Sequence, residues 1–116
     1  MKYFKLSEFD SPDIKGSAEN MQKDFLEKID LARSYANIPF KINSGFRTVA
    51  RNQRAGGSVN SSHLKGVACD IHCTDSKSRL IMVNALLNAG FRRIGIANTF
   101  IHADLDKQKP HAIWLY

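Results

Sequence analysis

The sequence has no apolar run that approaches the roughly 18 residues of a membrane-spanning helix, so we expect no membrane insertion. Its first residues, MKYFKLSEFDSPD, lack the apolar stretch of a secretory signal, which predicts synthesis in the cytoplasm without a signal peptide. No internal repeat, low-complexity segment or linker interrupts the 116 residues. We therefore expect a single domain over 1–116, with an N-terminal arm or loop over 1–18, and a monomer.

Cysteine is scarce as well. Cys69 and Cys73 are the only two, and a zinc finger would need further Cys or His partners at finger-like spacing. If their segment is a strand, four residues span roughly 13 Å, which is too far for a disulfide. We expect two free, buried thiols, as suits a reducing compartment.

Acidic residues are outnumbered, with 11 Asp and Glu against 17 Lys and Arg, for a net charge of +6. This balance favours an anionic partner: nucleic acid, an acidic membrane surface, or an acidic polymer such as bacterial cell wall. The sequence lacks a stacked aromatic platform, a helix rich in Arg and Lys, and a finger motif, so we expect no nucleic-acid partner. Retention on DNA with a steep salt dependence would reverse that expectation.

Hydrophobic periodicity predicts two amphipathic helices. The first covers about 18–36, with Ser17 as its N-cap. Its apolar stripe, which we expect in the core, consists of Met21, Phe25, Ile29, Ala32 and Tyr35. The second begins at a cap, Asp75 or Ser76, and ends at Gly90.

Five β-prone segments accompany these helices: 40–44, 67–73, RRIGIA, FIHADLD and AIWLY. A long polar connection, GFRTVARNQRAGGSVNSSH, joins the first two and contains one helical turn near 49–54. Loops of this length in a small domain are usually functional or disordered. The order of elements predicts an α+β fold, with helices packed on a mostly antiparallel sheet.

The stretch SSHLKGVACDIHC holds several metal-ligating side chains and could be a metal site, a redox site or a polar turn. His63 lies where the loop enters the strand, Asp70 lies within the strand, and Gly66 allows a tight turn between them. A carboxylate in an apolar strand must be paired or must bind a metal. The alternative is an Asp70 that hydrogen-bonds nearby backbone groups.

A second polar pair lies in FIHADLD, where His102 and Asp104 are two apart and therefore face the same side of a strand. Asp106 would share that face if the strand continued. Two His and one Asp would leave zinc one open position for water, the arrangement of a catalytic zinc site.

Arg47, in NSGFRT, follows a strand and a glycine-containing turn and so lies beside the long loop. A guanidinium there can grip a carboxylate or stabilise an oxyanion. The alternative is a solvated surface arginine.

Together these segments resemble one family. SGFRT, Asn52, the Gly56–Gly57 pair, SSHLKGVACD and FIHADLD are similar to the zinc D-Ala-D-Ala carboxypeptidases, in particular to short phage and prophage members that consist of little more than the catalytic domain. The pattern S-x-H-x-x-G-x-A-x-D with a later H-x-D carries the resemblance, which runs from about residue 20 to the C-terminus.

The resemblance implies that His63, Asp70 and His102 bind one zinc ion per chain. It makes Arg47 the substrate or transition-state arginine, and it gives Ser61 a role in contacting substrate or orienting the first histidine. It also implies the small α+β fold shared with hedgehog signalling domains. Manganese or cobalt could replace zinc with this ligand set.

The sequence departs from the family at the general base. Several members have Glu or Asp three residues before the last zinc histidine, where this chain has Thr99, which cannot take a proton. Asp104 is the nearest acid, and His111 is another candidate unless it is only a surface histidine. His72 shares a face with Asp70; it is either a fourth ligand or a neighbour that orients ligands or substrate.

The implied function is hydrolysis of an amide bond in peptidoglycan stem peptides, next to a D-amino acid. The bond could be that of a carboxypeptidase, of a cross-link endopeptidase, or of L-Ala-D-Glu cleavage. The enzyme would act on the wall after release, as in phage lysis, or on cytoplasmic muropeptides. The alternative is a non-catalytic zinc-containing module that binds cell wall, which Thr99 and His72 favour.

Overall fold

The computed structural model describes all residues, 1–116. Its α-helices are α1 Lys23–Ala36, α2 Val49–Arg54 and α3 Ser76–Ala89. Its strands are β1 Ile42–Ser44, β2 Ala68–His72, β3 Arg93–Ile96, β4 Phe100–Asp104 and β5 Ala112–Leu115. Three short 3₁₀ helices are η1 Leu6–Phe9, η2 Ser17–Asn20 and η3 Ser62–Lys65.

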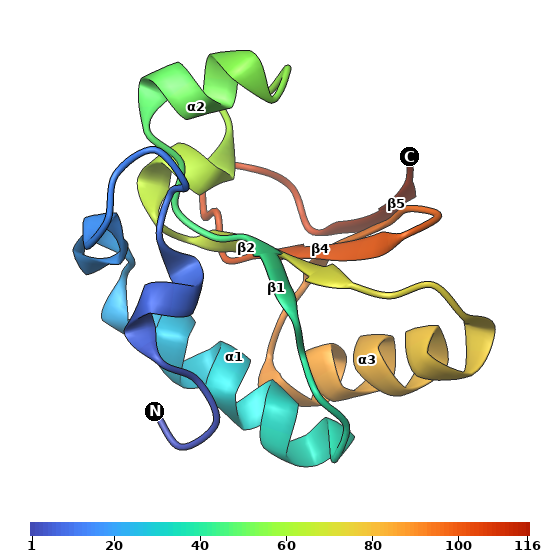
Figure 1. The fold of residues 1–116 in the computed structure, drawn as a ribbon. Helices are drawn as coiled ribbons and strands as arrows, with labels where there is room; N and C mark the ends of the chain where they lie inside the picture. The colour runs from blue at the N-terminus through green and yellow to red at the C-terminus, as the bar shows by residue number, and fades with distance from the viewer.

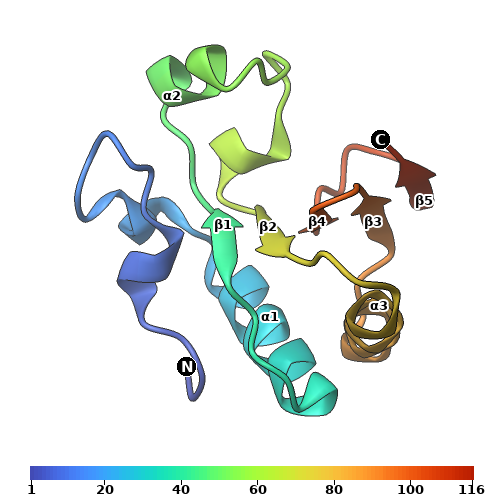
Figure 2. The ribbon, with the colours of Figure 1, turned by 45° about the vertical axis from the view of Figure 1, so that its right-hand side comes forward.

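The strands form one sheet in the order β1-β2-β4-β3-β5 (Figure 2). The β1/β2, β2/β4 and β4/β3 pairs are antiparallel, whereas β3 and β5 are parallel. The predicted α+β class with a mostly antiparallel sheet is confirmed. The predicted strands 40–44 and 67–73 are each shorter in the structure.

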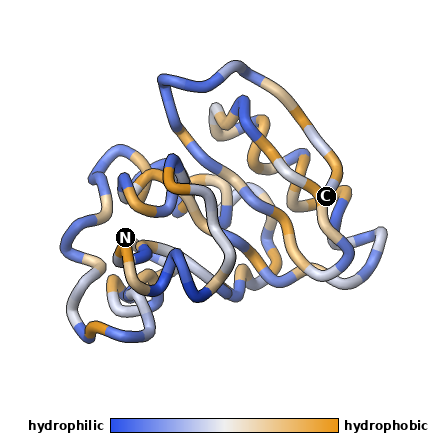
Figure 3. Tube along the Cα trace, turned by 90° about the horizontal axis from the view of Figure 1, so that it is seen from above, coloured by the Kyte–Doolittle hydropathy of each residue, from blue (hydrophilic) through white to orange (hydrophobic).

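Helices α1 and α3 lie side by side against one face of the sheet, while α2 and η3 lie on the opposite side (Figures 1 and 2). The helix-covered face carries the core residues of the strands, among them Cys69, Ile71, Ile101 and Ala103. Because side chains alternate along a strand, the residues between them face the other way. Figure 3 shows hydrophobic and hydrophilic residues interspersed along the whole chain. Both cysteines are free and buried, as predicted.

The first helix differs from its prediction. Ser17 opens η2 instead of capping α1, and the extended backbone at Met21 separates the two helices. Phe25 and Ile29 of the predicted stripe are buried, but Tyr35 is exposed and Ala36 takes its place. Eleven residues make just over three full turns, so position 36, not 35, returns to the stripe of position 25.

The second of the two predicted helices, α3, begins and ends as predicted. Asp75 caps α3 by accepting a hydrogen bond from the Ser78 backbone N–H, and Gly90 ends it with a positive φ of 106°. The N-terminal segment is more structured than an arm, since η1 places Phe9 in the core against Phe25. None of the helices has the length and apolar character of a membrane span.

Candidate active site

Two of the predicted metal ligands face each other across neighbouring strands. Asp70 on β2 is paired with His102 on β4, and both side chains leave the sheet on the side away from α1 and α3. The row continues through Gly95 on β3 to Trp114 on β5. The antiparallel register therefore brings a carboxylate, an imidazole and an indole together from residues that lie far apart in the sequence.

His63 reaches the same place from η3. Ser61 caps this short helix, its Oγ accepting a hydrogen bond from the His63 backbone N–H at 3.2 Å. Gly66 ends the helix with φ +70°, and a Cβ there would lie 2.1 Å from the Asn20 carbonyl oxygen. Only glycine meets both conditions, so Gly66 allows the tight turn between His63 and the start of β2.

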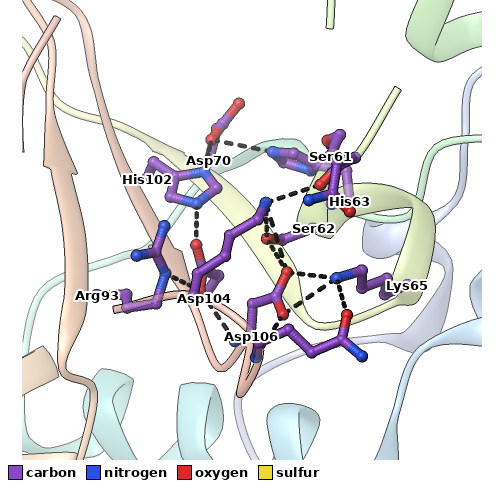
Figure 4. A network of polar contacts seen from close by, with 12 residues as sticks. Ser61, Ser62, His63, Lys65, Asp70, Arg93, His102, Asp104 and Asp106 are labelled. Atoms are coloured by element: carbon purple, nitrogen blue, oxygen red, sulfur yellow. Dashed lines mark hydrogen bonds and ion pairs between the residues drawn. The ribbon is translucent and has the colours of Figure 1, made fainter. Parts of the chain in front are cut away.

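The three ligand atoms have the spacing that a small cation needs (Figure 4). Oδ1 of Asp70 lies 3.4 Å from Nε2 of His63 and 3.0 Å from Nδ1 of His102. One ligand atom from each residue falls within 4.8 Å of the others, and all three residues are buried. Tetrahedral zinc with bonds of about 2.0–2.1 Å separates its ligand atoms by roughly 3.3 Å. The donor set and its geometry both fit zinc.

Each histidine has a partner for the ring nitrogen that faces away from this point. Nδ1 of His63 lies 2.8 Å from the Gly45 carbonyl oxygen, so it carries a proton and leaves Nε2 free. Nε2 of His102 lies 2.7 Å from Oδ2 of Asp104, and its Nδ1 faces Oδ1 of Asp70 at 3.0 Å. The fold thus directs the other nitrogen of each ring toward Asp70, where it can bind a metal once it carries no proton.

The charges of the site are strongly coupled. Burial alone would raise the pKa of Asp70, but hydrogen bonds from His102 and His63 outweigh it and hold that pKa well below its usual range. Burial likewise opposes the charge on His102, yet its hydrogen bonds with Asp104 and Asp70 raise its pKa. In the metal-free protein, the buried carboxylates therefore favour a cation at this point, either a proton or a metal ion.

Arg47 lies beside the ligands and is nearly buried. Its Nη2 lies 3.4 Å from Oδ2 of Asp70, its Nε donates to Ser44 Oγ at 3.0 Å, and its Nη1 donates to Asn52 Oδ1 at 3.4 Å. Asn52 is itself buried and donates through Nδ2 to the Ser58 carbonyl at 2.8 Å. Arg47 is therefore held in place and is not a solvated surface arginine.

A cavity of about 410 Å³ opens over these residues. The loop after α2 forms part of it, and Phe100, Trp114 and Tyr116 form an aromatic wall. Its lining comprises Arg47, Ala55, Gly56, Gly57, Ser58, Ser61, Ser62, His63, Asp70, Arg93, Phe100, His102, Asp104, Lys109, Trp114 and Tyr116. The predicted metal ligands, Arg47 and Ser61 thus share one solvent-accessible space.

The family model for peptidase M15 matches residues 2–104. The chain belongs to the peptidase M15 family. The matched range contains His63, Asp70 and His102 and ends before β5. M15 peptidases are zinc-dependent, in agreement with the resemblance seen in the sequence and with the grouping of these three side chains. A search of curated proteins finds no match.

Two predicted members of the M15 site lie outside the cavity. His72, at the end of β2, is exposed and is not part of the three-residue ligand group. His111 is exposed and lines a separate cavity, together with Arg92, Asp106 and Lys107. Thr99, which stands where several family members have the general base, precedes β4 and does not line the cavity either.

Other residues of the site were not predicted. Arg93 donates from Nε to Asp104 Oδ1 at 2.8 Å, and the Trp114 ring lies beside that of His102, with centroids 5.5 Å apart and the planes tilted by 49°. Asp106 does not continue β4; its buried carboxylate accepts hydrogen bonds from Ser62 and Lys65 (Figure 4). Neither Arg93 nor Trp114 belongs to a sequence motif, and only the strand register reveals their position.

Proposed function

We propose that this M15 peptidase hydrolyses an amide bond in the stem peptides of peptidoglycan, as a D-Ala-D-Ala carboxypeptidase or endopeptidase. The observation that carries the proposal is the meeting of one Asp70 oxygen with one nitrogen each of His63 and His102, at the base of an accessible cavity. The net charge of +6 suits an anionic polymer such as the cell wall.

His63, Asp70 and His102 hold the zinc ion, which when bound supplies a Lewis acid and activates water for attack on a carbonyl. Arg47 binds the oxygen of that carbonyl. Of the five N–H groups of a guanidinium, three are engaged with Ser44, Asn52 and Asp70, and two remain for substrate. Because Arg47 is already positioned, it stabilises the developing oxyanion without reorganising.

Hydrolysis also delivers a proton to the leaving amine. Of the two acids expected from the sequence, Asp104 lines the cavity and His111 does not. The Tyr116 phenol lines the cavity as well; burial raises its pKa, with Asp70 and Asp104 adding to that effect. It therefore keeps its proton at neutral pH. We propose Tyr116 as a further candidate for this donor, and Tyr116→Phe tests that role directly.

The proposal is tested by measuring zinc content and the release of fragments from purified peptidoglycan. Wild type is compared with His63→Ala, and with His72→Ala as a control that removes an exposed histidine from the same region. We expect one zinc ion per chain and fragment release in wild type and in His72→Ala, with both lost in His63→Ala. Mass spectrometry of the fragments then identifies the bond that is cut.

Two results would contradict the proposal. Zinc binding without any fragment release would indicate a non-catalytic module that binds cell wall. Loss of zinc from His72→Ala would make His72 a fourth ligand and the site a closed, structural one.

A further inference from the structure

Asp104 is the most completely buried carboxylate of the site, with 1% of its surface exposed. Its two oxygens have different partners. Oδ2 lies 2.7 Å from Nε2 of His102, while Oδ1 accepts hydrogen bonds from Arg93 Nε at 2.8 Å and from the Asp106 backbone N–H at 3.0 Å. Figure 4 shows this chain running from Asp70 through His102 and Asp104 to Arg93.

Resting on the proposed zinc site, we infer that Asp104 positions His102 and does not carry the proton of the reaction. Both oxygens of Asp104 are engaged on the side of His102 away from the metal ligands. As an acceptor for Nε2–H, Asp104 keeps the His102 proton on Nε2 and leaves Nδ1 for the metal.

Arg93 and the β4–β5 turn keep Asp104 in this orientation. The two donors at Oδ1 fix the carboxylate, so that Oδ2 points at the imidazole. Arg93 is held in turn by the Pro110 carbonyl, which accepts from its Nη1, and by the Trp114 ring, whose centroid lies 4.8 Å from its guanidinium carbon. The positioning unit therefore extends from β3 to β5.

The decisive variant is Asp104→Asn, which keeps the size of the side chain but makes one oxygen an NH₂ group. Two N–H donors, from Arg93 and the Asp106 backbone, demand the amide oxygen. The NH₂ group then faces His102, whose Nε2 must accept a hydrogen bond, and the ring proton moves to Nδ1. This change blocks the nitrogen that binds the metal.

We would measure the zinc dissociation constant by chelator competition and the tautomer of His102 by ¹⁵N NMR of the metal-free protein at alkaline pH, where the ring is neutral. In wild type we expect the Nε2–H tautomer. In Asp104→Asn we expect the Nδ1–H tautomer and zinc binding weaker by about 10–100-fold. The thermal unfolding of each metal-free variant shows whether the fold is preserved.

Asp106→Asn is the matched control, because Asp106 is another buried carboxylate paired with a cation and contacts neither histidine. We expect it to leave the tautomer and the zinc affinity unchanged. An equal loss of zinc affinity in both variants, or an Nε2–H tautomer in Asp104→Asn, would overturn the inference.

His63→Ala separates this inference from the proposed function. If it loses zinc while Asp104→Asn binds zinc as wild type does, the metal site stands and the positioning role of Asp104 is wrong. If His63→Ala binds zinc as tightly as wild type, the metal site itself is wrong.

Discussion

Arg47 and Asp70 meet at the base of the cavity, where Nη2 of the arginine lies 3.4 Å from Oδ2 of the aspartate. The other oxygen of Asp70 faces both metal-ligating histidines. One carboxylate thus joins the candidate metal ligands to Arg47, the arginine that we propose binds substrate. The link is short because β1, which precedes Arg47, pairs with β2, which carries Asp70.

Arg47→Lys should separate substrate chemistry from metal binding. A lysine ammonium cannot form the fork by which Arg47 contacts Ser44, Asn52 and Asp70. We expect the zinc content to stay at the wild-type level and kcat/KM for peptidoglycan fragments to fall about 10²–10³-fold, as when one oxyanion donor is removed.

Arg54 is an exposed arginine at the end of α2, so Arg54→Lys is the control for that measurement. We expect this variant to keep the wild-type kcat/KM. Unchanged kcat/KM in Arg47→Lys would show that Arg47 only pairs with Asp70. Zinc loss from the same variant would instead assign Arg47 to the metal site.

Gly57→Ala should disturb Arg47 indirectly, through Asn52. A Cβ at Gly57 would lie 2.1 Å from Asn52 Oδ1 and 3.2 Å from Arg47 Nη1, so Asn52 must move and Arg47 loses its acceptor. We expect a lower kcat/KM with zinc retained. Overpacking of this kind typically costs about 1–3 kcal/mol of stability, which thermal unfolding would report.

Gly56→Ala offers a matched control one residue away. A Cβ there meets nothing within 4 Å, although φ is +73°, so the change adds backbone strain without touching Asn52. Equal losses of kcat/KM in the two variants would mean that loop strain, not the displacement of Asn52, reduces activity.

The sequence was sufficient for the parts of the site that depend on local patterns. The spacing of His63 and Asp70 around Gly66, and of His102 and Asp104 along a strand, predicted side chains that the structure places together. Helical periodicity and β-prone runs likewise predicted both long helices and all five strands. The predicted start of α1 was wrong, since Ser17 does not cap this helix and instead accepts a hydrogen bond from the Ser11 backbone N–H.

The parts that could not be predicted depend on tertiary register. Arg93 and Trp114 approach the site only because β3 lies between β4 and β5. His111 has the same imidazole as a catalytic histidine, and no local sequence pattern indicates that it lies away from the cavity. The burial of Asp106 with Ser62 and Lys65 depends on contacts between residues over 40 positions apart.

Zinc affinity should rise with pH. In the metal-free protein, burial opposes the charge on His102, but its hydrogen bonds with Asp104 and Asp70 raise its pKa above 6.5. The ring therefore stays protonated to a higher pH than a free histidine, and zinc must displace the proton on Nδ1. The pKa of Asp70 is lowered, so this carboxylate stays ionised throughout.

Displacement of one proton predicts a tenfold gain in affinity per pH unit below the raised pKa, with a plateau above it. Chelator competition at a series of pH values would measure this slope, and His72→Ala should leave it unchanged. A zinc affinity that stays flat between about pH 5.5 and 7 would show that His102 is not among the ligands.

Gly95→Ala should displace the aromatic wall of the cavity. Gly95 lies between His102 and Trp114 in the cross-strand row, and a Cβ there would lie 2.6 Å from Trp114 Nε1 and 2.7 Å from Tyr116 Cε2. Both rings must move to make room for this Cβ. Because Trp114 is the only tryptophan, its fluorescence reports the movement directly, and we expect a red-shifted emission together with a lower kcat/KM. Zinc should remain bound, since neither ring supplies a ligand atom.

Gly16→Ala, at a site where a Cβ meets nothing within 4 Å and φ is +85°, should add backbone strain without changing the emission. If Gly95→Ala shifts the emission but keeps full activity, the aromatic wall does not contribute to binding the substrate, and Tyr116 cannot be the proton donor.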